Sequence, residues 1–214
     1  MNRKIGIDVD DCICNTLEMD YAYAYFKYKD KIKNIDKIEP NHYDVTKLLN
    51  IENPDNFFIQ EKNYIMKHNS MYPKVFVKEV LEKLREKNFE VLIISSRKSK
   101  FWSGDAEKYL KIWLDKYEIP CDNVFCDVED KTKILEKYGI DILVEDNPSY
   151  VENANNKGFE TILLKSDYNK NYQNSLNKFA QSWIEIYKIL GEKYNFNYND
   201  LVWLFTKTSK NDKK

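Results

Sequence analysis

The chain has 214 residues, of which 43% are hydrophobic and 14% aromatic. This length accommodates one α/β domain with a sizeable insertion, or two small domains. Its 34 basic and 35 acidic residues leave a formal net charge of -1, so charge gives no reason to expect a nucleic-acid polymer or a membrane surface as a partner.

The N-terminal sequence M-N-R-K-I-G-I-D has no apolar stretch long enough for a signal peptide, and no run approaches the length of a membrane helix. We therefore expect a cytoplasmic protein. Four cysteines (Cys12, Cys14, Cys121 and Cys126) fit that compartment as free thiols. Their spacing does not favour zinc, because neither pair has the usual two-residue gap and the pairs lie far apart in the sequence.

The first half of the chain predicts one strand followed by helices. Residues 5–7 form a short apolar run, which is typical of a strand buried on both faces of a parallel sheet. Apolar residues at helical spacing then predict a helix over residues 17–31 and shorter helices at 45–49 and 57–66. Nothing from residue 17 to 72 alternates like a strand, so we interpret this segment as a small helical insertion.

The second half predicts alternating helices and strands. Pro73 is at a position typical of a helix start, and that helix is expected to end at Asn88. Strands are then expected at residues 91–94, 124–125, 142–144 and 161–164. Helices are expected after Gly104-Asp105, at residues 131–138, after Asn147-Pro148, and in the terminal apolar stretch that begins at Trp183. The alternation predicts a parallel sheet with helices on both faces.

Polar side chains follow three of these strands. They are Asp8, Asp10 and Asp11 after the first strand, Ser95 after the second, and Glu145 and Asp146 after the fourth. Because sheets of this kind bind ligands at the carboxyl ends of their strands, these side chains are expected to share one site. Crowded buried acids are costly unless a cation is shared among them. The absence of G-x-G-x-x-G and of a P-loop leaves a dinucleotide or P-loop triphosphate site unsupported.

In this order, the groups resemble the four motifs of haloacid dehalogenase (HAD) superfamily phosphatases. The matching segments are Asp8-Val9-Asp10, Ser95 in Ile94-Ser95-Ser96-Arg97, Lys131, and Glu145-Asp146. The resemblance implies a Rossmann-like α/β core of residues 1–16 and 73–206, a helical cap at residues 17–72 and a flexible Lys-rich tail at 207–214. The helical cap is similar to that of the 5'(3')-deoxyribonucleotidase branch and of small bacterial nucleotidase-like proteins.

The resemblance also implies the roles of individual residues. Asp8 would be the nucleophile that forms an aspartyl-phosphate, and Asp10 would be the general acid and base. Since the dehalogenases of the superfamily lack an acid at the position of Asp10, carbon–halogen chemistry is not expected. Ser95 would hold a phosphoryl oxygen and Lys131 would neutralise charge. Ser96 and Lys133 remain alternatives for these two positions.

The same resemblance implies Mg²⁺ as the cofactor, which suits a site of oxygen ligands beside phosphate. Its ligands would be the Asp8 side chain, the Asp10 backbone carbonyl and Asp146, with Glu145 contacting the ligands and not the metal. Two positions depart from the family pattern. Asp11 stands where Gly is frequent, and Cys12 stands where Thr or Val is usual.

The leading interpretation is a Mg²⁺-dependent phosphomonoesterase for a small phosphorylated metabolite, with a nucleoside 5'-monophosphate as the candidate. A catalytically degenerate HAD-fold protein with a binding or regulatory role is the alternative. A signalling receiver domain is disfavoured, because its phospho-accepting Asp follows the third strand and its hydroxyl the fourth. We expect the cap to recognise the leaving group through exposed aromatic residues, starting with Tyr43, whereas most of its rings are expected to pack between its helices. The same segment contains both histidines, His42 and His68. The sequence leaves the oligomeric state open.

Overall fold

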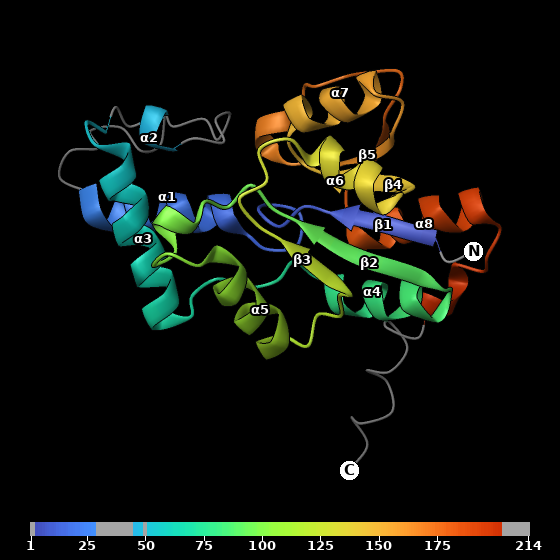
Figure 1. Cartoon of the computed structure of the whole chain (residues 1–214), viewed down its shortest axis with the longest axis horizontal. Coiled ribbons are helices and arrows are strands. Elements are labelled where there is room, and N and C mark those ends of the chain that lie inside the picture. The colour runs from blue at the N-terminus through green and yellow to red at the C-terminus, as the bar shows by residue number, and fades with distance from the viewer. Residues whose placement is uncertain (1–2, 29–44, 49–50, 203–214) are drawn as a thin grey trace, which may run out of the picture.

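The structure is a computed structural model that describes residues 3–28, 45–48 and 51–202. This part of the chain contains a six-stranded parallel sheet of order β3-β2-β1-β4-β5-β6 (Figure 1). The strands are β1 (Arg3–Ile7), β2 (Phe89–Ile94), β3 (Asn123–Phe125), β4 (Ile142–Glu145), β5 (Glu160–Leu164) and β6 (Lys178–Ala180). The predicted parallel sheet is therefore confirmed.

Helices cover both faces of the sheet, because the strands are apolar on both sides. On one face lie α4 (Val77–Glu86), α5 (Ala106–Lys116) and α8 (Trp183–Tyr194), and on the other lie α6 (Lys131–Tyr138) and α7 (Pro148–Asn156). Ile5 and Ile7 of β1 pack into the first of these cores, whereas Leu92 and Ile94 of β2 pack into the second. This alternation of side chains is what a strand between two helical layers requires.

Strand β1 lies at the centre of the sheet, between β2 and β4. Its Gly6 permits a close approach of the helical layer, since a Cβ there would lie 3.0 Å from Ile94 and 3.3 Å from Leu135 of α6. Helix α6 can therefore pack tightly against the central strand, at the level where that strand leads into its acidic loop.

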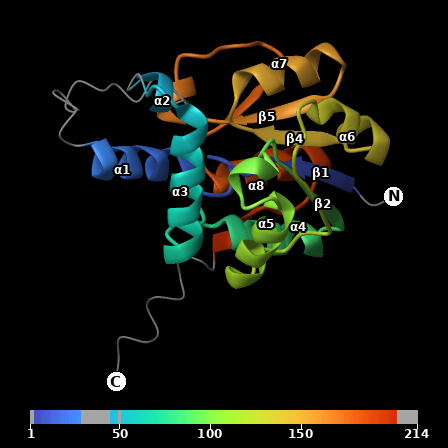
Figure 2. The ribbon, with the colours of Figure 1, turned by 60° about the vertical axis from the view of Figure 1, so that its left-hand side comes forward.

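Three helices, α1 (Thr16–Tyr28), α2 (Val45–Leu48) and α3 (Pro54–His68), are inserted between β1 and β2. Figures 1 and 2 show α1 and α3 side by side beyond the carboxyl ends of the strands. These helices have a small hydrophobic cluster of their own, made by Tyr23, Ala24, Val45 and Phe57. Helix α3 also packs on the 3₁₀ turn η2 (Ser99–Phe101) that follows β2, so the insertion contacts the segment after the second strand.

Most of the expected bounds that fall on described residues are met within three residues. The predicted helix ends at residues 31 and 49 and the predicted tail at 207–214 lie outside the described residues. Helix α6 has the predicted limits, with Gly139 as its left-handed C-cap at φ 61°. The prediction of a helix start at Pro73 is wrong: Pro73 forms an isolated bridge with Cys14, and the helix begins only at Val77. Strand β6 was not predicted. No helix in the described ranges is long and apolar enough to cross a membrane.

Candidate active site

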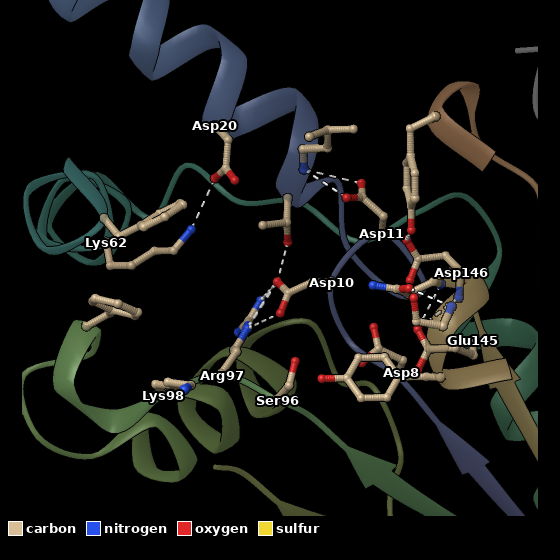
Figure 3. A pocket seen from close by; sticks show the side chains of 18 of the residues that line it. Asp8, Asp10, Asp11, Asp20, Lys62, Ser96, Arg97, Lys98, Glu145 and Asp146 are labelled. Carbon is tan, nitrogen blue, oxygen red and sulfur yellow. Dashed lines mark hydrogen bonds and ion pairs between the residues drawn. The ribbon is translucent and has the colours of Figure 1, made fainter. Parts of the chain in front are cut away.

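The candidate site lies where the strand order reverses, at the carboxyl ends of β1, β2 and β4. Strand β1 pairs with β2 on one side and β4 on the other, and such a switch point opens a crevice in an α/β sheet. Figure 3 shows Asp8, Glu145 and Asp146 on one side of this pocket and Lys62 and Asp20 on the other, with Asp10 between them. The acids predicted from two separate sequence segments are thus brought together.

Asp8 is 4% exposed, and its backbone N–H donates to the Val144 carbonyl of the neighbouring strand at 3.0 Å. Lys131, the first residue of α6, donates to Asp8 Oδ1 and to Glu145 Oε2, the latter at 2.5 Å. Asp130 caps this helix and so fixes where Lys131 points. Of the two candidate lysines, Lys131 contacts the acids, whereas Lys133 is exposed on α6.

Four buried side chains, Asp8, Cys12, Glu145 and Asp146, place one donor atom each within 4.8 Å of one another. Glu145 is fixed by its Oε1, which accepts from the N–H groups of Asp146 at 3.1 Å and Asn147 at 3.0 Å. Burial and the Glu145 carboxylate raise the pKa of Asp8 to about 8, and the same two causes raise the pKa of Asp146. Three buried carboxylates with one lysine are short of positive charge, and they therefore fit a hard divalent cation.

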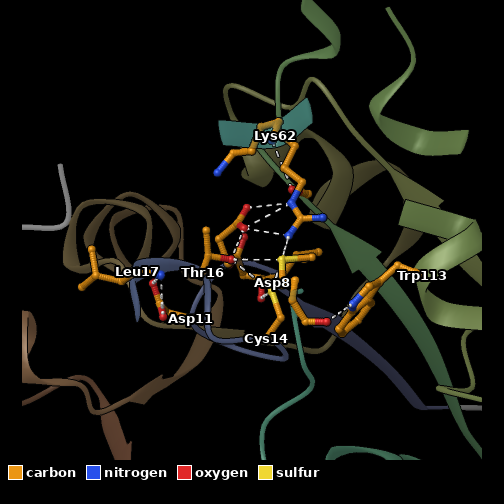
Figure 4. A network of polar contacts seen from close by, with 12 residues as sticks. Asp8, Asp11, Cys14, Thr16, Leu17, Lys62 and Trp113 are labelled. Atoms are coloured by element: carbon orange, nitrogen blue, oxygen red, sulfur yellow. Dashed lines mark hydrogen bonds and ion pairs between the residues drawn. The ribbon is translucent and has the colours of Figure 1, made fainter. Parts of the chain in front are cut away.

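Asp10 has a different environment. Its carboxylate accepts from Arg97 Nε at 3.0 and 3.2 Å, from Arg97 Nη2 at 2.8 Å and from the Thr16 hydroxyl at 2.5 Å. Burial alone would raise the pKa of Asp10, but the charge and hydrogen bonds of Arg97 outweigh it and lower this pKa to about 2. Figure 4 shows Thr16 and Cys14 within this network. The Asp10 side chain is not among the four crowded donors, and its expected role toward a metal is through the backbone carbonyl.

The two serines after β2 differ in their surroundings. Ser95 is fully buried and its hydroxyl accepts from the Arg97 backbone N–H at 3.1 Å. Ser96 lines the pocket, and Figure 3 places it beside Asp10. The geometry therefore gives Ser96 the more direct access to the pocket, whereas Ser95 is buried and already accepts a backbone hydrogen bond.

Of the two departures from the family pattern, Asp11 has a structural explanation, and Cys12 contacts the site without one. Asp11 adopts φ 58°, a left-handed conformation that Gly tolerates best and that Asp tolerates better than most residues. Its carboxylate accepts from Leu17 N–H at 3.1 Å and thereby caps α1, while burial raises the pKa of Asp11 to about 7. The Cys12 thiol lies 3.8 Å from Asp146 Oδ1, and the Cys12 carbonyl accepts from the Trp183 indole of α8 at 2.9 Å.

The pocket has a volume of about 650 Å³, which is in the range of small-molecule sites. Its aromatic lining comes from both parts of the fold: Phe58 from α3, and Phe101, Trp102, Tyr150 and Tyr168 from segments beyond residue 73. Lys62 lines the wall opposite the acids. It contacts Asp20 Oδ1 at 3.1 Å and Glu61 Oε2 at 2.6 Å. His68 is not among the lining residues, and Tyr43 and His42 lie outside the described residues.

Sequence reasoning missed several residues of the pocket, notably Thr16, Asp20, Lys62, Arg97 and Trp102. A signal existed for two of them. Thr16 and Asp20 are four apart, so they share one face of α1. Arg97 stood within the quoted serine motif, but its partner could not be identified, because its contact with Asp10 joins residues 87 apart in the chain.

Comparison with known proteins agrees with this arrangement. A family model for "5' nucleotidase, deoxy (Pyrimidine), cytosolic type C protein" matches residues 2–194. A nucleotidase of Clostridium acetobutylicum is 25% identical over 189 residues, which are 87% of this chain and 93% of that protein.

Solved structures share the fold. A HAD phosphatase from Thermococcus onnurineus has a TM-score of 0.60 at 18% identity, covering 88% of this chain and 98% of its own. A HAD-superfamily hydrolase from Geobacter sulfurreducens has a TM-score of 0.59 at 13% identity, covering 88% and 96%. The resemblance seen in the four motifs is confirmed. The chain belongs to the cytosolic type C family of 5'-nucleotidases within the HAD superfamily, and it is a phosphatase or nucleotidase enzyme.

Proposed function

We propose that this protein is a Mg²⁺-dependent phosphomonoesterase that acts through an aspartyl-phosphate on Asp8, with a nucleoside 5'-monophosphate as the candidate substrate. The observation that carries the proposal is the pairing of two unlike carboxyl groups at one pocket. Asp8 is buried among acids and bonded to Lys131, whereas Asp10 faces the pocket with its carboxylate held by Arg97 and Thr16. The assignment of Asp8 as nucleophile and Asp10 as general acid follows the order of the family motif, because the pKa shifts, upward for Asp8 and downward for Asp10, taken alone would favour the reverse.

In the first step, an Asp8 carboxylate oxygen attacks phosphorus and the bond from phosphorus to the leaving oxygen breaks. Because Arg97 holds free Asp10 as a carboxylate, Asp10 must first take up a proton, which the negative charge of the bound phosphoryl group would favour. Asp10 then gives this proton to the leaving oxygen, so the product leaves as an alcohol. In the second step, water attacks the phosphorus of the aspartyl-phosphate and Asp10 takes a proton from it. The bond from phosphorus to Asp8 then breaks, which yields inorganic phosphate and the free carboxylate. Lys131 balances the negative charge at Asp8 throughout.

The metal would be held by Asp8, Asp146 and the Asp10 backbone carbonyl, with Glu145 supporting the ligands. When bound, it supplies positive charge that stabilises the phosphoryl oxygens during transfer. The support in this chain is the shortage of positive charge among three buried carboxylates. Among the described residues, Lys131 is the one lysine or arginine that forms ion pairs with Asp8 and Glu145.

The cap is proposed to comprise residues 17–72, and the core residues 1–16 and 73–206. Recognition of the leaving group would then involve both parts, because Phe58 faces a pocket that Phe101 and Trp102 also line. Aromatic rings suit stacking on a nucleobase, at about 1–3 kcal/mol for each stacked base. We place the protein in the cytoplasm, with a small phosphorylated substrate as its partner.

The test is a panel of phosphomonoesters, which includes nucleoside 5'-monophosphates and a generic aryl phosphate, assayed with and without Mg²⁺. We expect turnover that depends on the metal, and its loss in Asp8→Asn, which removes the nucleophile and keeps the shape. Circular dichroism and the melting temperature report whether the variant is folded. Near wild-type turnover by Asp8→Asn would rule out the aspartyl-phosphate. A wild-type protein that binds nucleotides without any turnover would support the degenerate alternative.

A further inference from the structure

The contact between Arg97 and Asp10 has a geometry that restricts the carboxyl group to one orientation. The two nitrogens Nε and Nη2 approach from one side, with the shortest distance, 2.8 Å, between Nη2 and Oδ1. Thr16 donates to the same Oδ1 at 2.5 Å. A planar guanidinium that donates from two nitrogens fixes both the position and the plane of a carboxylate, which a lysine cannot do.

The two oxygens of Asp10 are unequally engaged. Oδ1 accepts three hydrogen bonds, from Arg97 Nε, Arg97 Nη2 and Thr16, whereas Oδ2 accepts one, from Arg97 Nε at 3.0 Å. The Asp10 side chain is 33% exposed and lines the pocket, and Oδ2, which accepts one hydrogen bond, keeps more free lone-pair capacity for a proton than Oδ1. The contacts thus fix Oδ1 in place and leave Oδ2 as the oxygen that can transfer a proton.

Arg97 is itself held in place. Its side chain is 4% exposed, and the guanidinium lies 4.6 Å above the ring of Trp102. Its Nη2 lies 3.4 Å from the sulfur of Cys14 and 3.3 Å from that of Met71. A buried, stacked guanidinium of this kind is part of the rigid frame of the site and differs from an exposed surface ion pair.

We propose that Arg97 is a positioning residue that, with Thr16, presents Asp10 Oδ2 to the leaving-group oxygen. The inference rests on the proposed function, since it concerns the proton that Asp10 gives when the bond to phosphorus breaks. It assigns Arg97 no contact with phosphate: the residue acts through Asp10 alone.

The experiment measures kcat/KM for a series of phosphomonoesters whose leaving groups range from an alcohol to 4-nitrophenol. This parameter reports the step that forms the aspartyl-phosphate, in which only a poor leaving group needs the proton of Asp10. Arg97→Ala removes the cation that lowers the pKa of Asp10, and this effect by itself would favour the protonated acid, so a loss of activity reports lost positioning. We expect a loss of roughly 10²-fold for the alcohol ester, at the low end of the contribution of a placed general acid. The loss for the 4-nitrophenyl ester should be much smaller, and added guanidinium ion should restore part of the activity on the alcohol ester.

Three variants complete the design. Arg97→Lys keeps the charge but donates from one nitrogen, so it should show the same dependence on the leaving group in weaker form. Thr16→Val should do likewise, because it removes one bond to Oδ1. Arg85→Ala removes an arginine with an exposed ion pair to Asp122 and should leave all substrates unchanged. If Arg97→Ala does not fold, the comparison rests on Arg97→Lys and Thr16→Val.

An equal loss on all leaving groups would overturn the inference, because it would mean that Arg97 binds the phosphate or only supports the fold. That outcome would leave the proposed function intact, since the wild-type protein would still hydrolyse the series. A wild-type protein that hydrolyses none of the esters would instead refute the proposed function, and the inference with it.

Discussion

Replacement of Lys62 by Met is expected to destabilise the protein in a way that depends on pH. Lys62 of α3 is the shared cation of two carboxylates, Asp20 Oδ1 at 3.1 Å and Glu61 Oε2 at 2.6 Å. The side chains of Lys62 and Asp20 are each 9% exposed, and that of Glu61 is fully buried. Methionine fills a similar volume, so the main effect of the change is to leave two buried acids without their counter-charge.

Removal of one partner from a buried ion pair costs about 3–5 kcal/mol. For a chain of this size, that corresponds to a fall in melting temperature of roughly 6–20 °C at neutral pH. Burial raises the pKa of Glu61 above its ordinary value even with Lys62 present, so Glu61 destabilises the fold increasingly as the pH rises from its unfolded pKa through its folded one. Without Lys62, this pKa should rise further. The loss caused by Lys62→Met should therefore be larger at pH 8 than at pH 5.

The assay is urea or thermal unfolding of wild type and Lys62→Met across that pH range, with Lys62→Met/Glu61→Gln as the test of mechanism. The double variant should recover part of the stability at pH 8, because it removes one of the uncompensated charges. Lys111→Met is the matched control, since its ion pair with Glu107 is exposed and is expected to contribute below about 1 kcal/mol. A loss that is independent of pH, or a double variant no better than the single one, would refute this reasoning.

Three further outcomes are expected at the pocket. Asp146→Ala should abolish the rise in melting temperature that Mg²⁺ gives the wild type. Tyr168→Phe removes the hydroxyl that donates to Asp146 Oδ2, so it should change the Mg²⁺ affinity measured by calorimetry and leave the site able to bind the metal. A wild-type melting temperature that Mg²⁺ does not change would contradict both expectations. Ser96→Ala should raise KM for a phosphomonoester more than Ser95→Ala does, and the reverse order would assign phosphate contact to the buried serine. Phe58→Leu should alter the relative kcat/KM among nucleotides, with little effect on a small aryl phosphate, and an equal loss on all of them would make this ring a structural element.

The fold could be predicted from local patterns, because short runs of consecutive residues identify the apolar strands and the helix caps. Asp130 and Gly139 delimit α6, and Asn147-Pro148 opens α7. Strand β6 was missed because its three residues, only one of them fully buried, carry too short a pattern. The start of α4 was misplaced because Lys74 N–H donates to the Ile13 carbonyl at 2.8 Å, a contact between distant segments that delays the helix.

The site was predictable to the extent that its residues follow strands. Asp8, Glu145 and Asp146 end neighbouring strands, so their meeting follows from the topology of a parallel sheet. The basic residues that pair with two other acids of the pocket, Asp10 and Asp20, come from segments that are distant in the sequence. Arg97 reaches Asp10 from the loop after β2, and the Lys62–Asp20 pair joins two helices of the insertion. Both contacts depend on the tertiary packing and have no signal in the local sequence.

The bond from the Trp183 indole to the Cys12 carbonyl joins residues 171 apart, and Lys131 reaches Asp8 across 123 residues. During synthesis, the acidic loop therefore leaves the ribosome long before the helices that brace it exist. Pairings across such separations carry a large loop-closure entropy and form slowly. A chain truncated before α8 keeps every motif residue but lacks the indole that supports the backbone beside Asp11. The completed pocket is thus expected to form late in folding, after α8 has been synthesised.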